Sequence, residues 1–134
     1  MYKIDKKEYG FYLVFADFIK MDEMQQWVKD SEKALTSSNG KFGVFIDMRS
    51  LKPILPDAQE YMQQGQKLYK QKGMLRSVVI LASAITAMQF KRIAKETGIY
   101  EWERYIDASK TPNWEKWVSI GFKMELIRMH KHTE

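Results

Sequence analysis

The chain has 134 residues, of which 45% are hydrophobic and 29% are charged, a balance typical of one folded domain. Because cysteine is absent, disulfides, thiolate nucleophiles and thiolate-bound metals are excluded. The formal net charge is +5. The basic side chains lie at helical spacing or at predicted helix ends, where solvated charges are usual, so we predict no nucleic-acid partner.

The first predicted element is a β-hairpin. Residues 2–5 and 11–16 are rich in aromatic and β-branched side chains, which favour strands. The polar turn over residues 6–10 separates them, so the two strands are expected to pair antiparallel.

A helix and a buried strand are predicted next. Asp22 is the expected N-cap of the helix, apolar side chains recur at helical spacing up to Leu35, and Gly40 follows its end. Residues 42–48 read FGVFIDM, a nearly continuous apolar run. A run of this kind predicts a strand that is covered on both faces.

The second half of the chain alternates between helix and strand. Pro56 opens a helix that Gly73 ends, because proline suits a first helical turn and glycine suits the residue after the last. The following predicted elements are a strand over 77–82, a helix over 85–97, a strand over 104–107 and a helix over 113–121 that Asn113 caps.

This order predicts a single α/β domain. Strands that alternate with helices form mostly parallel sheets, and the opening hairpin adds one antiparallel edge. We therefore expect a mixed, mostly parallel sheet of about five strands with four or five helices. The domain is predicted to cover residues 1–121, and an amphipathic basic tail to cover residues 122–134.

The expected location of a site is the loop that follows the buried strand. Ligands and partners of open α/β sheets gather at the carboxyl ends of the strands. Asp47, Arg49 and Ser50 lie there, and Asp57 and Tyr61 belong to the helix that follows. These five residues are our candidates for partner binding, although polar groups in such loops more often cap turns.

The chain has few side chains of the kinds that act as catalytic groups. The only two histidines, His130 and His132, lie within the last five residues, so a hydrolase or transferase would depend on Asp47, Ser50 or Ser83 without a nearby imidazole. The glycines form no phosphate-binding fingerprint, and the acidic pairs lack the spacing of a transition-metal site. We predict no catalytic residues, no metal and no cofactor.

The predicted tail has a strong amphipathic pattern. Phe122, Leu126 and Met129 share one helical face in residues 122–132. This face requires a cover, which is its own domain, a second copy of the chain or a membrane surface. We expect a homodimer, since closed twofold pairs are the commonest assemblies.

The layout resembles the SpoIIAA-like superfamily, which includes STAS domains, and within it a bacterial group of unknown function. The similarity covers about residues 2–121 and depends on three segments, which are FGVFIDMRSLKPILPDAQEY (42–61), RSVVILAS (76–83) and ERYIDASKTPNWEKW (103–117). Phosphorylatable STAS domains carry a hydroxyl where their second helix opens. Pro56 or Asp57 stands at that point here. The resemblance thus implies a fold and a partner surface, without the phosphorylation switch.

Two function hypotheses follow. The first is a cytoplasmic, non-enzymatic protein-interaction domain that binds a protein partner or itself. The alternative is a carrier or sensor of an apolar small molecule or lipid, which the resemblance to lipid-transfer domains and the nine methionines and four tryptophans both suggest. No segment of the sequence approaches the length of a membrane span.

Overall fold

The computed structural model describes residues 1–38 and 40–108 of the chain. Within them an opening hairpin is followed by alternating helices and strands. The elements are β1 (Tyr2–Lys7), β2 (Gly10–Phe15), α1 (Met21–Leu35), β3 (Phe42–Asp47), α2 (Pro56–Lys72), β4 (Met74–Leu81), α3 (Ala84–Thr97), the short 3-10 helix η1 (Tyr100–Trp102) and β5 (Glu103–Asp107).

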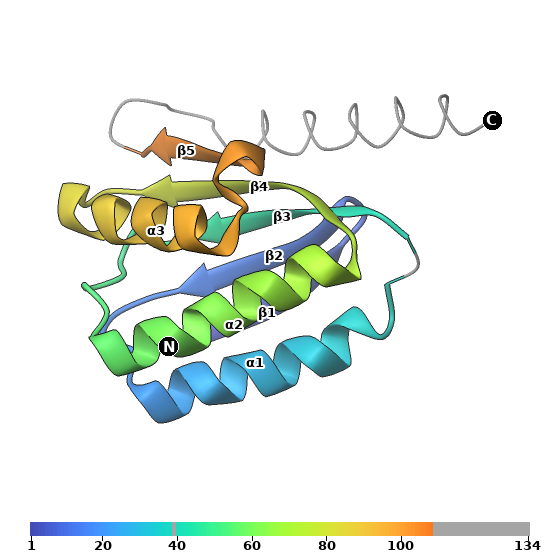
Figure 1. The fold of residues 1–134 in the computed structure, drawn as a ribbon, viewed down its shortest axis with the longest axis horizontal. Helices are drawn as coiled ribbons and strands as arrows, with labels where there is room; N and C mark the ends of the chain where they lie inside the picture. The colour runs from blue at the N-terminus through green and yellow to red at the C-terminus, as the bar shows by residue number, and fades with distance from the viewer. Residues whose placement is uncertain (39, 109–134) are drawn as a thin grey trace.

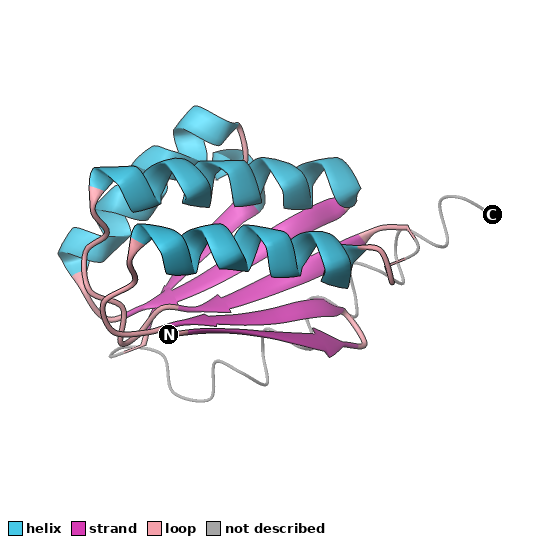
Figure 2. Ribbon diagram, turned by 90° about the horizontal axis from the view of Figure 1, so that it is seen from below, coloured by secondary structure: helices cyan, strands magenta, loops and turns pink. Residues whose placement is uncertain are grey.

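The strands form one five-stranded sheet in the order β1-β2-β3-β4-β5. β1 pairs antiparallel with β2, and every later pair is parallel (Figure 1). Each crossover moves the chain one strand further in the same direction. Because such crossovers are right-handed, the described helices all lie on one face of the sheet (Figure 2).

The predicted α/β class and the mixed sheet are confirmed. The described residues hold three α-helices rather than the four or five predicted, and η1 was not predicted. The helix predicted over 113–121, and with it the proposed division between 1–121 and the tail 122–134, lies outside the described residues.

Apart from shifts of one or two residues at the ends of other elements, two predicted boundaries are wrong. Lys20 is the N-cap of α1, and Asp22 lies inside the first turn, where its carboxylate accepts a hydrogen bond from the Glu23 amide. β4 begins at Met74, three residues before its predicted start. Gly73 explains the second error, because its left-handed backbone (φ 119°) ends α2 and reverses the chain at once.

β3 is the centre of the fold and is buried along its whole length. Val44 and Ile46 belong to the main core between the sheet and the helices. Phe45 points to the opposite face, where it packs with Ile80 and Tyr9 in a second, smaller cluster. The prediction of a strand covered on both faces is therefore confirmed.

The two long helices α1 and α2 meet at a glycine. A Cβ atom on Gly65 would lie 2.0 Å from the Trp27 ring, so only glycine allows the indole to pack against this turn of α2. The Trp27 ring also stacks on Tyr69, with ring centroids 5.9 Å apart. This contact sets the spacing between the two helices.

We expect Gly65→Ala to lower the free energy of unfolding by about 1–3 kcal/mol, because the new methyl group overlaps the buried indole. Urea denaturation measures the change. Gln64→Ala, at an exposed position of the same helix, is the matched control and should change stability by less than about 0.5 kcal/mol. Equal stabilities of the two variants would contradict this packing.

Candidate interaction surface

The parallel strands end at one edge of the sheet, and the helices begin there. β2, β3 and β4 each pass into a short loop and then into the first turn of α1, α2 or α3 (Figure 1). Backbone hydrogen bonds tie two of these loops together, since the Asp17 amide donates to Ser50 O over 2.9 Å and the Lys52 amide donates to Asp17 O over 3.0 Å. We refer to this side of the molecule as the carboxyl edge.

Asp47 and Arg49 form an ion pair at the carboxyl edge. The Arg49 Nη2 atom lies 2.7 Å from Asp47 Oδ2, and its Nε atom lies 3.0 Å from Oδ1. The Arg49 backbone amide also donates to Asp47 Oδ1 over 3.1 Å, and the Tyr12 hydroxyl reaches Oδ2 over 3.3 Å. The carboxylate thereby fixes the turn that follows β3.

The environment of Asp47 affects its titration. Burial of the residue, which is 7% exposed, raises the pKa of its carboxyl group. The hydrogen bonds and positive charge of Arg49, together with the bond from Tyr12, outweigh burial and leave the pKa below its usual 3.8. A lowered pKa means that this carboxylate stabilises the fold above pH 3.8 and that the contribution disappears as the pH falls through the lowered value.

The other three predicted partner-binding residues have local roles. Ser50 is exposed, and its carbonyl accepts the bond from Asp17. Asp57 is exposed in the first turn of α2, where its Oδ1 accepts from the Ala58 amide over 2.7 Å. Tyr61 is half-buried against the main core. The structure thus joins Asp47 and Arg49 directly but shows no shared contact for the remaining three.

We expect Asp47→Asn to destabilise the protein by about 1 kcal/mol at pH 7, a modest value because the Arg49 side chain is 44% exposed. The difference in the free energy of unfolding between the native chain and the variant should become smaller below pH 3.8, where the carboxylate of the native chain becomes protonated. Denaturation at several pH values measures it. Glu60→Gln, on the exposed side of α2, is the control. A deficit that stays constant down to pH 2 would count against the ion pair.

Exposed apolar side chains gather at the carboxyl edge. Seven large hydrophobic side chains are exposed among the described residues, and six of them lie at this edge. We call these six the apolar edge; they are Met1, Phe18, Met21, Leu55, Ile85 and Met88. Only Tyr100 lies elsewhere.

The apolar edge follows from where the helices start. Met21, Leu55 and Ile85 stand at or next to the first residue of α1, α2 and α3, before the buried stripe of each helix begins. Met88 is 72% exposed, although it lies only two residues before the fully buried Phe90. Met1 also lies at this edge, because β1 runs antiparallel to β2 and begins beside the end of β2. Its amino group donates a hydrogen bond to Ala16 O over 3.0 Å.

Charges of both signs surround the apolar edge. Lys20 and Lys52 are exposed in its loops, and Lys91 is exposed in α3. The carboxylates of Asp17 and Asp57 are exposed beside them. An apolar centre with a mixed polar rim is the usual composition of a protein interface.

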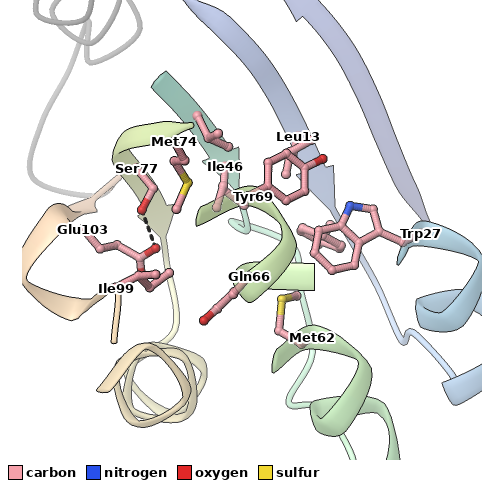
Figure 3. A pocket seen from close by; sticks show the side chains of 12 residues that line it. Leu13, Trp27, Ile46, Met62, Gln66, Tyr69, Met74, Ser77, Ile99 and Glu103 are labelled. Atoms are coloured by element: carbon pink, nitrogen blue, oxygen red, sulfur yellow. Dashed lines mark hydrogen bonds between the residues drawn. The ribbon is translucent and has the colours of Figure 1, made fainter. Parts of the chain in front are cut away.

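A cavity in the main core lies between the sheet and the helices (Figure 3). Its volume is about 20 Å³, which accommodates about one water molecule. Binding sites for organic ligands usually enclose 300 Å³ or more. The structure therefore offers the carrier hypothesis no cavity of suitable size in the described core. The lining residues are Leu13, Phe15, Trp27, Val44, Ile46, Met62, Gln66, Tyr69, Met74, Ser77, Ile99 and Glu103.

Glu103 brings a carboxyl group into this cavity, and sequence reasoning missed it. The residue is 4% exposed, and its Oε2 accepts a hydrogen bond from Ser77 Oγ over 2.6 Å (Figure 3). Its Oε1 accepts from the Tyr105 hydroxyl. Burial raises the pKa of Glu103, and these two hydrogen bonds offset only part of the effect. The charged carboxylate is thus disfavoured in the folded protein.

We expect Glu103→Gln to gain stability relative to the native chain as the pH rises. The raised pKa means that the folded native chain loses stability above the usual value of 4.5, whereas the amide does not titrate. Between pH 4.5 and 8 the difference in the free energy of unfolding should move steadily in favour of the variant. A pH-independent difference, measured by denaturation, would contradict the raised pKa.

The described residues hold neither a metal-binding cluster nor a membrane-spanning helix. No group of three acidic or histidine side chains is placed to hold a metal ion there. No helix in the same part of the chain has the length and apolar character that a membrane crossing requires. Comparisons with protein-family models, with curated proteins and with solved structures give no match.

Proposed function

We propose that this chain is a non-enzymatic, cytoplasmic protein-interaction domain of the STAS-like kind, and that it binds a protein partner through the apolar edge. The observation that carries the proposal is the position of the exposed apolar side chains. Six of the seven in the described residues lie at the edge where open α/β sheets usually bind ligands and partners. An exposed group of this kind is typical of an interaction site.

The composition of the apolar edge favours a protein partner over a lipid surface. Three of its six side chains are methionines, which adapt their shape to a partner. Burial of a side chain such as Leu55, now 51% exposed, contributes about 1 kcal/mol to binding. Anionic membranes select clusters of basic residues, whereas this edge also carries Asp17 and Asp57.

Two serine hydroxyl groups that could act as nucleophiles have structural roles, which supports a non-enzymatic function. Ser83 Oγ accepts a hydrogen bond from the Thr86 amide and so caps α3. Ser77 is paired with the carboxyl of Glu103 in the manner of a nucleophile and base, but it is fully buried. A substrate has no access to that pair.

Binding at this edge is proposed to be constitutive. α2 opens with Pro56 and Asp57, at the point where phosphorylatable STAS domains carry a hydroxyl. The Asp57 carboxylate is exposed in the first turn, where it complements the helix dipole and supplies a permanent negative charge. A partner that recognises this charge needs no kinase.

Photo-crosslinking in the native cells tests the proposal. Benzoylphenylalanine placed at Leu55 or at Met88 should form the same adduct with one partner, because both positions belong to one surface. The same group placed at Lys67, an exposed position midway along α2, is the matched control and should not form it. An adduct of twice the protein's mass would identify a second copy of the chain as that partner.

Leu55→Ser combined with Met88→Ser should weaken the captured interaction at least tenfold, as expected when two apolar contacts are lost. Both side chains are at least half exposed, so the free energy of unfolding should change little. Loss of binding without loss of stability separates a contact role from a folding role. Adducts that form equally well at Lys67, or undiminished binding by the double variant, would overturn the proposal.

A further inference from the structure

A basic groove lies at the opposite edge of the sheet, where β3, β4 and β5 begin. Its volume is about 380 Å³. Three cationic side chains line it, each from a different segment: Lys41 precedes β3, Lys70 belongs to the last turn of α2, and Arg76 belongs to the start of β4. Trp102, from η1, supplies an aromatic wall, and Gly73, Met74 and Leu75 complete the lining.

The floor of the groove is rigid backbone. Gly73 adopts φ 119°, and a Cβ atom there would lie 2.5 Å from Gly40 O, so the end of α2 packs directly on the loop before β3. The Phe42 amide also donates to Gly73 O over 3.1 Å. These contacts fix the segments that carry Lys41 and Arg76 relative to each other, so the groove is formed before any ligand arrives.

Lys70 is held in place against the aromatic wall. Its Nζ atom lies 5.0 Å from the centroid of the Trp102 ring, which is the distance of a cation–π contact. The same atom would lie 3.1 Å from a Cβ on Gly98, so the end of α3 leaves room for it by carrying glycine. The ammonium group is therefore directed toward the aromatic wall of the groove.

The charge of the groove favours an anion. None of the described lining residues is acidic. The carboxyl end of α2 adds partial negative charge, which Lys70 and Lys72 in its last turn offset. Lys41 then supplies further positive charge to the same concave surface. Arg76 also lines it, and its Nη1 atom donates a hydrogen bond to Leu75 O over 3.5 Å.

We propose that this groove binds a small phosphorylated molecule with a flat organic ring, of the size of a mononucleotide. Phosphate matches a group of ammonium and guanidinium donors. Trp102 and the apolar atoms of Leu75, which is half-buried, provide the wall against which the organic part packs. The volume fits one such molecule and is too small for a nucleic-acid duplex. This site is distinct from the apolar edge, since the two lie at opposite ends of the strands.

Calorimetric titration of the full chain at low salt tests the proposal, with adenosine monophosphate, adenosine and inorganic phosphate as probes. We expect the monophosphate to bind most tightly, phosphate more weakly and adenosine least. Arg76→Gln or Lys41→Gln should weaken monophosphate binding about tenfold, as loss of a charge-assisted hydrogen bond predicts. Lys67→Gln, which removes the same charge from an exposed position of α2 outside the groove, should leave the affinity within about twofold.

Trp102→Leu gives an independent readout. It should weaken binding of the monophosphate much more than binding of inorganic phosphate, because only the first probe has a ring, whereas both lose the contact that positions Lys70. Lack of binding of both phosphate-bearing probes, or equal effects of Lys67→Gln and Arg76→Gln, would overturn the proposal. Binding to vesicles of phosphatidylglycerol in the absence of monophosphate binding would likewise contradict it, since the groove would then recognise a charged surface rather than a small molecule.

Discussion

The parallel pairing of β2, β3, β4 and β5 is the constraint from which the rest of the structure follows. Parallel neighbours require crossover helices, and right-handed crossovers in one direction place those helices on a single face. The helices α1, α2 and α3 therefore each begin at the carboxyl edge and end at the opposite edge (Figure 1). This geometry gathers the exposed apolar side chains at the starts of α1, α2 and α3 at one end and the basic last turn of α2 at the other.

The interior of the described fold is apolar, and its buried polar side-chain atoms are hydrogen-bonded except for the Trp27 indole Nε1. Ser31 Oγ lies 2.9 Å from the Tyr69 hydroxyl, and Thr97 Oγ1 donates to Gln66 Oε1 over 2.8 Å. Glu103 lowers the stability of the fold when it is ionised, because burial disfavours its charged form. These hydrogen bonds connect α2 to α1 and to α3. The cavity that remains in the main core has a volume of about 20 Å³, which is too small for an organic ligand.

Periodicity and glycine placement predicted most of the fold but only part of the site. The apolar run of β3, Pro56 at the start of α2 and Gly73 at its end act locally, so the sequence reveals them. The Asp47–Arg49 pair could also be predicted from the sequence, since the two residues are only two positions apart. The apolar edge and the basic groove could not be predicted from the sequence, because each combines residues from separate segments that only the folded sheet brings together.

Oxidative footprinting tests the central claim, that the apolar edge is covered by a protein partner, most directly. Hydroxyl radicals generated in native cells and in the purified protein label exposed methionine and tyrosine side chains. Met21 and Met88 should react readily in the purified protein and be protected in cells, while exposed Tyr100 reacts equally in both and buried Met24 and Met62 react in neither. Equal oxidation of Met21 and Met88 in cells and in the purified protein would contradict the account.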